Sequence, residues 1–228
     1  MSGVGPAEVD LAASRLPAEV RDTPSVRSAW LSEVAGHQVW LKLESLQPTH
    51  SFKVRGAFNA LAAAGTRLSD GLVTASAGNH GAALAWACAR AGVPLTVFTP
   101  RDAPRTKLAR IAALGAVLRD EAEDYDAAER RGRVFASGRG VPFVSPYNDA
   151  HVVAGAGTIA REILVQVPEA DEIVVPLGGG GLASGVALAV IDQPRRPWVT
   201  AIEPAVSPAF TTALASGAIV PIAVGVRF

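Results

Sequence analysis

Cysteine is nearly absent from this chain of 228 residues, and the single one, Cys88, cannot form an internal disulfide. A small secreted scaffold held together by disulfides is therefore excluded. Cys88 lies in the alanine-rich stretch ALAWACARAG, where we expect it to pack as a small core residue. The four histidines, His37, His50, His80 and His151, are dispersed without the spacing of metal ligands, so we expect no metal site.

An excess of charge of one sign is also lacking. Lys+Arg and Asp+Glu each total 21, so the formal net charge is zero. The basic residues are scattered, apart from short clusters such as Arg130, Arg131 and Arg133, and we expect no nucleic-acid partner. The pattern GxxxxGK[ST] does not occur, which excludes a P-loop nucleotide hydrolase.

Uninterrupted hydrophobic runs are short, although the 49% hydrophobic composition supplies a sizeable core. The N-terminus lacks a basic start followed by an apolar run, so no signal peptide is recognised. Residues 173–191 carry no charge and approach membrane-spanning length, but Pro176 and the glycines at 178–181 interrupt them. They are better explained as a strand, a turn and a buried helix. We therefore expect a cytoplasmic protein without a membrane partner.

Short apolar runs alternate with alanine-rich stretches of helical pattern along most of the chain. Repeated units of strand and helix predict an α/β fold of open parallel sheets with helices on both faces. Ligands of such sheets bind in the strand-to-helix turns. The predicted strands are 39–43, 72–74, 95–98, 117–118, 143–144, 173–177 and 199–202. The predicted helices are 52–64, 79–91, 103–114, 122–137, 151–166, 180–191 and 207–216.

Residues 49–61, THSFKVRGAFNAL, place a lysine near the start of a predicted helix. Ser51 can serve as the N-cap, which puts Lys53 in the first turn, where the helix dipole disfavours a cation. One interpretation is an ordinary solvated lysine. The other is that the amine of Lys53 is partly desolvated, with a lowered pKa, and acts as a nucleophile.

A run of four glycines, 178–181, follows the apolar strand EIVVPL and opens a helix. Backbone N–H groups in such a turn approach an anion closely, which predicts a phosphate site, although the glycines could instead only permit close packing. Gly178, Gly180 and Ala183 also satisfy G-x-G-x-x-A, and Glu203 follows at the end of the next strand. A nicotinamide-dependent oxidoreductase is therefore an alternative.

A second turn, in LVTASAGNHGAALAWA, joins a short strand to a long helix. Backbone amides of Ser76, Ala77, Gly78 and Asn79 could hold an anion such as a substrate carboxylate, and the Asn79 side chain offers both a donor and an acceptor. The alternative is a plain turn with a helix cap. Taken alone, His80 would be a packed or surface residue.

These three stretches, in this order, resemble the fold-type II pyridoxal phosphate enzymes, the tryptophan synthase β-like family. KLESLQPTHSFKVRGAFNAL is similar to the cofactor-lysine segment, TASAGNHGAALAWA to the asparagine loop and VPLGGGGLASG to the phosphate loop. The resemblance extends from about Thr23 to Glu203 and is greatest to the threonine and serine dehydratase branch.

The resemblance implies pyridoxal 5'-phosphate as the cofactor. Lys53 would bind it covalently, Phe52 would lie beside its ring, and Asn79 would contact the ring oxygen. The phosphate would be held by Gly178, Gly179, Gly180, Gly181 and Leu182.

The reaction implied is a lyase reaction, β-elimination from L-threonine or L-serine to a 2-oxo acid and ammonia. Ser76, Ala77 and His80 would surround the substrate. Serine racemases of the family resemble SSGNHG at this loop, and their second serine serves as an acid. Ala77 takes its place here and favours dehydration. A racemase-like enzyme or another member of the family is the alternative, and the choice between threonine and serine stays open.

The resemblance also implies two domains, a large one from residues 1–70 and 149–228 and a small one from 71–148. A homo-oligomer is compatible with this organisation. His50 stands where the family commonly has glycine, and Glu203 lacks the aspartate that accompanies it in metal-binding members. Family members continue beyond Phe228, so we expect a truncated large domain, and a non-catalytic, cofactor-binding chain is a further alternative.

Overall fold

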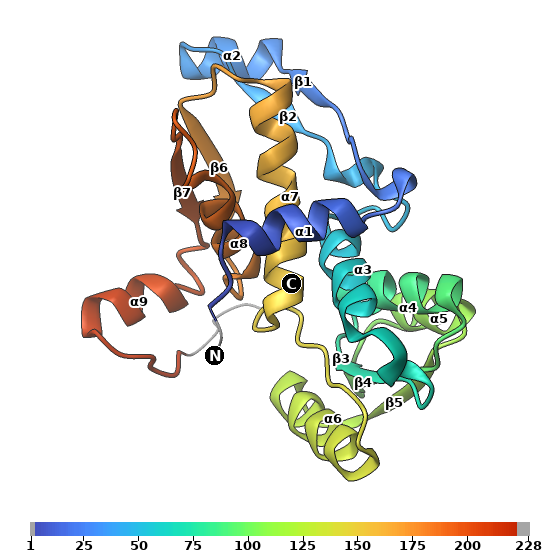
Figure 1. Cartoon of the computed structure of the whole chain (residues 1–228). Helices are drawn as coiled ribbons and strands as arrows, with labels where there is room; N and C mark the ends of the chain where they lie inside the picture. Colours follow the sequence, from blue (N-terminus) through green and yellow to red (C-terminus); the bar gives the residue numbers. More distant parts are fainter. Residues whose placement is uncertain (1–2, 223–228) are drawn as a thin grey trace.

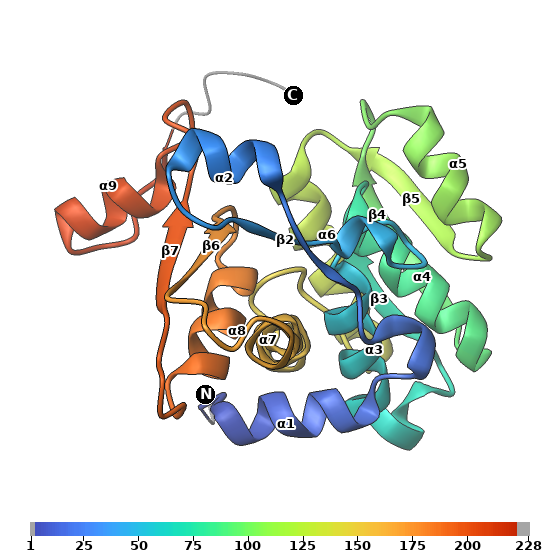
Figure 2. The same ribbon diagram turned by 90° about the horizontal axis from the view of Figure 1, so that it is seen from above.

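The computed structural model describes residues 3–222, apart from the side chains of residues 66 and 67. Helix α7 (Ala150–Gln166) runs through the middle of the molecule, with α1 (Pro6–Arg15), α3 (Lys53–Ala64) and α8 (Gly181–Val190) packed around it (Figures 1 and 2). Small sheets lie on either side of these helices. The α/β fold expected from the sequence is thus confirmed.

A parallel sheet of three strands lies on one side of α7. Apolar side chains alternate between its two faces: Leu72 and Val97 pack with α3, whereas Val73 and Phe98 pack on the opposite face. Both faces are therefore buried. In pairing order the strands are β3 (Leu72–Ala75), β4 (Leu95–Pro100) and β5 (Val117–Ala122). The helices that follow them in the chain are α4 (Asn79–Ala91), α5 (Arg105–Ala113) and α6 (Tyr125–Arg139).

The strand predicted at 143–144 contributes only one parallel bridge, between Phe143 and Val73. Pro142 and Pro146 flank this segment, and a proline cannot donate a ladder hydrogen bond. The segment therefore runs along the edge of the sheet and continues towards α7.

On the other side of α7, β6 (Glu172–Pro176) and β7 (Trp198–Ile202) form a parallel pair joined through α8. Ile173 and Val175 are buried against α1, α7 and α8. The intervening side chain of Val174 is 57% exposed, and Trp198 is 81% exposed. This pair of strands thus has one covered face and one exposed apolar face.

Several N-terminal elements have no counterpart among the predicted ones. Besides α1, these are β1 (Ser25–Arg27) and α2 (Ala29–Ala35). Strand β1 pairs antiparallel with β2 (Trp40–Lys42), which corresponds to the strand predicted at 39–43. All seven predicted helices are present among the described residues, with ends shifted by three residues or fewer, including α9 (Ala209–Ser216). The short 3₁₀ turns are η1 (Ala18–Val20), η2 (Glu44–Leu46) and η3 (Gly65–Leu68).

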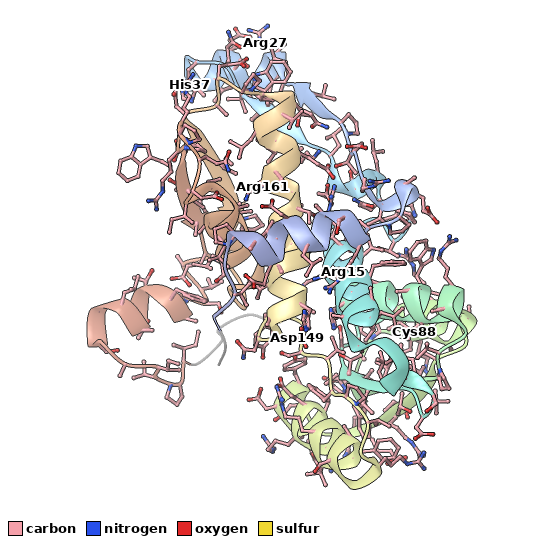
Figure 3. All side chains as sticks on the ribbon, in the orientation of Figure 1. Arg15, Arg27, His37, Cys88, Asp149 and Arg161 are labelled. Atoms are coloured by element: carbon pink, nitrogen blue, oxygen red, sulfur yellow. The ribbon has the colours of Figure 1, made fainter. Side chains whose placement is uncertain are left out.

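The predicted cap of α3 is wrong. The helix begins at Lys53 with Phe52 in the N-cap position, and no side chain caps it. Ser51 is buried, and its hydroxyl has no hydrogen-bond partner among the described residues. Cys88, in contrast, lies buried in α4 as expected (Figure 3). None of the described helices is both long and apolar enough to cross a bilayer.

Candidate active site

Lys53 lies at the first position of α3 and is half-buried. Its amine donates a hydrogen bond of 2.8 Å to the carbonyl oxygen of Pro146 and lies 5.2 Å from the centre of the Phe52 ring. Burial lowers the pKa of the Lys53 amine from 10.5 to about 8. A substantial fraction of the amine is therefore neutral near pH 8, and it is not the freely solvated lysine considered above.

His80 is the second residue of α4 and is 2% exposed. Neither ring nitrogen has a hydrogen-bond partner among the described residues. Burial, followed by the positive charge of Lys53, lowers the pKa of His80 to about 3, while the Val144 carbonyl acts in the opposite direction. The imidazole is therefore neutral, and it lies close enough to Lys53 for the charge of the amine to act on it.

The asparagine turn follows β3 and leads into α4. Ser76 is buried, and its hydroxyl accepts a hydrogen bond of 3.2 Å from the backbone N–H of Gly78. No side chain caps α4, so its first N–H groups are not satisfied by a cap. Asn79 is exposed and Ala77 half-buried, and among the described residues no hydrogen bond joins the Asn79 side chain to Lys53 or to the glycine turn.

Two of the four glycines pack closely against Tyr147, and a Cβ atom on a third, Gly180, would lie 2.8 Å from Cζ of Phe210. A Cβ atom on Gly179 would lie 2.5 Å from Cγ of Tyr147, and one on Gly181 would lie 3.0 Å from Cα of the same residue. Tyr147 therefore packs directly beneath this turn. The close-packing interpretation holds for these two positions.

The other two glycines have different surroundings. A Cβ atom on Gly178 would meet no atom within 4 Å, so this residue borders open space. Gly180 has φ +85° and forms the N-cap of α8, a conformation that favours glycine. The backbone N–H groups of residues 178–181 make no hydrogen bond to other described residues. Leu182 packs its side chain into the core and offers only its backbone to the turn.

The segment from Val144 to Tyr147 connects these features. Val144 faces His80, Pro146 accepts the hydrogen bond from Lys53, and Tyr147 supports the glycine turn. The structure thus brings Lys53 and Phe52, His80 and the glycine turn to the border of one short segment. The sequence analysis singled out neither Pro146 nor Tyr147, because the spacing of SPYN carries no recognisable signal.

These residues fit pyridoxal phosphate. An aldehyde requires a partly neutral amine, which Lys53 supplies, and a phosphate requires unpaired N–H groups at a helix N-terminus, which residues 178–181 supply. The open space beside Gly178 leaves room for the phosphate oxygens.

Glu203 does not serve the nicotinamide alternative. Its carboxylate accepts hydrogen bonds from the backbone N–H groups of Phe210 at 3.0 Å and Thr211 at 2.7 Å, so it caps α9 and is not free to bind a ribose. Within residues 3–222, no group of three or more His, Cys, Asp or Glu side chains is arranged to hold a metal ion.

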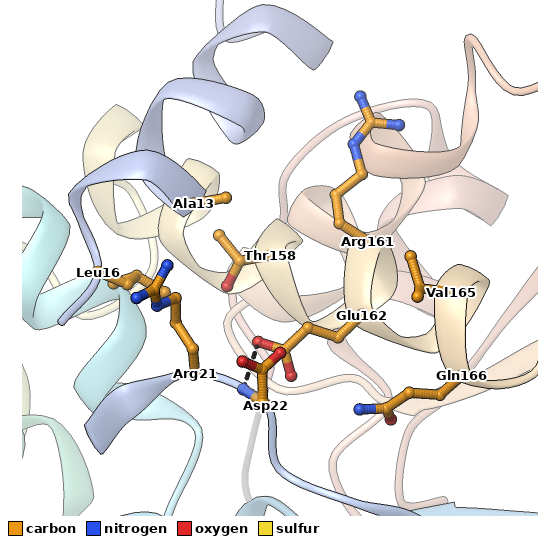
Figure 4. A pocket seen from close by; sticks show the side chains of 9 residues that line it. All are labelled: Ala13, Leu16, Arg21, Asp22, Thr158, Arg161, Glu162, Val165 and Gln166. Carbon is orange, nitrogen blue, oxygen red and sulfur yellow. Dashed lines mark hydrogen bonds between the residues drawn. The ribbon is translucent and has the colours of Figure 1, made fainter. Parts of the chain in front are cut away.

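A separate cavity of about 250 Å³ lies between α1, α7 and the turn after η1 (Figure 4). None of the predicted site residues borders it, so it is not the site described above. Its lining consists of Ala13, Leu16, Arg21, Asp22, Thr158, Arg161, Glu162, Val165 and Gln166.

The fold is that of an α/β protein, and the residues around Lys53 and the glycine turn fit a phosphorylated aldehyde. Residues 16–227 match the family model described as pyridoxal-phosphate dependent enzyme. The chain belongs to this family. The resemblance and the cofactor expected from the sequence are thereby confirmed.

Individual relatives agree with the family. An L-threonine ammonia-lyase of Thermotoga maritima is 43% identical over 176 residues, 75% of this chain and 43% of that protein. One of Geobacter sulfurreducens is 37% identical over 213 residues, 93% of this chain and 53% of that protein. The structure of maize serine racemase is similar with a TM-score of 0.89 and 32% identity, over 96% of this chain and 67% of that one. This chain spans about half the length of these curated relatives.

Proposed function

We propose that this protein is an ammonia-lyase that eliminates the β-hydroxyl group of L-threonine or L-serine and yields a 2-oxo acid and ammonia. The observation that carries the proposal is the half-buried Lys53 amine, with a pKa of about 8, held on the Pro146 carbonyl. The names of the relatives, two of which are L-threonine ammonia-lyases, support this class of reaction.

In the proposed site, Lys53 would hold the cofactor covalently and Phe52 would flank its ring. The N–H groups of residues 178–181 and of Leu182 would hold the phosphate, and the Asn79 amide would contact the ring oxygen. Bound pyridoxal phosphate withdraws electron density from Cα of the amino acid, which acidifies the Cα proton.

The side chains of this chain perform the proton transfer. With the substrate bound, the neutral amine of Lys53 would take the Cα proton, for which a pKa of about 8 is suitable. The backbone of Ser76 and Ala77 holds the substrate carboxylate, and the neutral ring of His80 donates or accepts a hydrogen bond beside it. The β-hydroxyl group would then leave as water, with the proton that Lys53 took from Cα, and a second water molecule would hydrolyse the carbon–nitrogen bond to release ammonia and the 2-oxo acid.

Racemisation requires a second proton donor on the opposite face of the substrate. Ala77 has no titratable group, so the proposal favours elimination over racemisation. We expect Ala77→Ser to produce D-serine from L-serine at a rate at least tenfold above the original chain, measured by chiral chromatography. Ala77→Gly is the matched control, because it changes size without adding a hydroxyl group, and it should produce no D-serine.

The decisive assay measures 2-oxo acid release from L-threonine and L-serine with pyridoxal phosphate present. We expect release that Lys53→Ala abolishes, together with a visible absorption band that borohydride shifts. One methyl group is worth only about 1–3 kcal/mol of discrimination, so both substrates belong in the assay. Unchanged binding and an unchanged reducible band in Lys53→Ala would refute the assignment of Lys53. Racemised serine without oxo acid would refute the elimination.

The remaining parts of the proposal come from the sequence. They are a small domain of residues 71–148 within a large domain of 1–70 and 149–228, a cytoplasmic location and a homo-oligomeric assembly. The packing of α3 against both α4 and α7 is compatible with two domains that meet at the Lys53 helix.

A further inference from the structure

Arg55 is fully buried, although it lies only two residues after Lys53 in the first turn of α3. Its guanidinium group binds two carboxylates through paired hydrogen bonds. Nε and Nη2 donate to Glu44 at 2.8 and 2.7 Å, and Nη1 and Nη2 donate to Glu162 at 2.6 and 2.9 Å. Such fork-shaped pairs fix the orientation of an arginine as well as its charge.

The group around Arg55 joins distant parts of the chain. Thr158 of α7 and Thr23 before β1 accept further hydrogen bonds from the guanidinium group, each at 3.2 Å. Lys42 of β2 donates to Glu162 at 2.7 Å. We call Lys42, Glu44, Arg55 and Glu162 the charge cluster; its formal charges cancel.

The start of α3 lacks a side-chain cap. Among the described residues no side chain caps the helix, and the hydroxyl of Ser51 has no hydrogen-bond partner. Two cations in the first turn are also unfavourable towards the helix dipole. The carboxylates of Glu44 and Glu162 offset this effect and hold the first turn from the side.

The two cations of this turn point in different directions. Residues 53 and 55 are about 200° apart around a helix, so Lys53 and Arg55 occupy nearly opposite faces. Arg55 reaches back to η2 and α7, whereas the Lys53 amine reaches Pro146. A rotation of α3 about its axis would break the charge cluster and would withdraw the amine from Pro146.

Folding stability alone does not explain such an arrangement. Desolvation of buried charges offsets most of their attraction, and apolar side chains of similar volume often stabilise a protein as well or better. We propose that Arg55, through the charge cluster, is a positioning residue that fixes the first turn of α3 and thereby the place of the Lys53 amine. This role rests on the proposed function of Lys53.

The test measures the reactivity of Lys53 without turnover. Pyridoxal, which lacks the phosphate, is trapped on the protein with borohydride between pH 6 and 11, and the adduct at Lys53 is quantified by peptide mass spectrometry. In the original chain we expect a midpoint near pH 8. The ionisable neighbour that the amine faces, His80, is neutral over this range.

The informative variant replaces the whole cluster, Lys42→Met/Glu44→Leu/Arg55→Met/Glu162→Leu, so that no single charge is left buried and unpaired. We expect it to fold with similar stability, but with a mobile, more hydrated amine. The midpoint should then rise from about 8 towards 10.5, and trapping at pH 7.5 should fall at least tenfold. A folded variant with an unchanged midpoint and rate would overturn the proposal.

Two further variants keep the test decisive. Arg55→Lys retains the charge but lacks the fork, so it should shift the midpoint in the same direction; if it folds and leaves the midpoint unchanged, the proposal fails. Arg161→Met removes a different arginine, which lies in α7 (Figure 3) and pairs with Asp10 and Asp192. This control should lose stability and keep the midpoint, and an equal shift in it would also refute the proposal.

Failure of the positioning role is distinguishable from failure of the proposed function. If Lys53 of the original chain is not trapped at all, the proposed function of Lys53 fails, and the positioning role fails with it. If Lys53 is trapped normally but the cluster variants behave like the original chain, only the positioning role of Arg55 is wrong.

Discussion

The buried amine of Lys53 destabilises the cofactor-free fold. Its amine has a pKa of about 8 in the folded chain and 10.5 when solvated, because burial disfavours the charged form. Below pH 8 the amine is protonated in both the folded and the unfolded state, so the folded state carries the full desolvation cost of the buried charge. Between pH 8 and 10.5 the unfolded state binds more protons, so the free energy of unfolding rises with pH and the cost disappears.

We therefore expect Lys53→Met to stabilise the cofactor-free chain at pH 7, an advantage that shrinks steadily as the pH approaches 10.5. Urea unfolding at pH 7 and pH 10 measures both values. Lys107→Met, on the exposed side of α5, is the control and should change little at either pH. A Lys53→Met variant that is less stable than the original chain at pH 7 would contradict this prediction.

His50 carries local backbone strain. It has φ +58°, and the one polar contact of its exposed side chain with the described residues is a long one of 3.4 Å, between Nδ1 and the carbonyl oxygen of Ser45. A left-handed conformation costs a non-glycine residue about 1–2 kcal/mol, a cost that glycine avoids. Glycine, however, loses more backbone entropy on folding, which costs about 0.5–1 kcal/mol. The glycine expected here from the resemblance thus has a conformational reason.

His50→Gly should raise the free energy of unfolding by up to about 1 kcal/mol, or the melting temperature by about 2–4 °C. His50→Ala, which keeps the Cβ atom and loses the contact with Ser45, should give no increase. Calorimetry on the original chain, His50→Gly and His50→Ala measures the three melting temperatures. An equal gain in both variants would show that loss of the imidazole, and not relief of strain, is responsible.

The helices could be predicted from the sequence to within three residues, but their caps could not. Helix α3, predicted at 52–64, spans 53–64, yet the predicted cap, Ser51, does not cap it. Helix α6, predicted at 122–137, begins only after Asp124, whose carboxylate accepts a hydrogen bond from Ala127, and is followed by Gly140 in the left-handed conformation. The strand predicted at 143–144 forms only a single bridge. Strand pairing depends on the neighbouring strands and on the flanking prolines, which the apolar pattern alone does not reveal.

Substitutions at two neighbouring glycines, Gly178 and Gly179, separate the packing of the glycine turn from its proposed binding of the phosphate. Gly179→Ala would place Cβ 2.5 Å from the Tyr147 ring, and overpacking of this kind costs about 1–3 kcal/mol. Gly178→Ala meets no atom and has an ordinary φ, so the fold should tolerate it. Because that methyl group enters the open space, Gly178→Ala should instead weaken cofactor binding.

Thermal unfolding without cofactor and titration with pyridoxal phosphate measure the two effects separately. Gly179→Ala should cost less stability in a Tyr147→Ala chain than in the original chain, because the ring that clashes with the new Cβ atom is then absent. If Gly178→Ala proves as destabilising as Gly179→Ala, the space beside Gly178 is not open, and the phosphate belongs elsewhere.

The proposed division of the whole chain predicts a distinctive pattern of proteolysis. Connections near residues 65–71 and 139–149 lead into and out of the proposed small domain. Brief digestion of the folded chain should therefore release a fragment close to 71–148, detected by mass spectrometry. Added pyridoxal phosphate should slow cleavage, because the site lies where the parts meet. Cleavage confined to the interior of residues 71–148 would argue against a separable domain.

The candidate site as a whole was only partly predictable. Lys53 and the glycine turn were recognisable because each combines residue type with a helix start. Arg55, Pro146 and Tyr147 were not, since their roles depend on contacts with residues up to 107 positions away. Polar contacts of this range leave no periodicity in the sequence, and burial of a charged residue such as Arg55 contradicts its usual preference.

Tyr147 supports the glycine turn with its ring, while its hydroxyl group donates a hydrogen bond of 3.2 Å to Glu129 in α6. One side chain therefore contacts both the glycine turn and α6, the helix that packs on the three-stranded sheet. If the turn binds the phosphate as proposed, any coupling between that anion and α6 through Tyr147 would be reciprocal, so that a shift of α6 would change the affinity for the anion and the anion would change the position of α6.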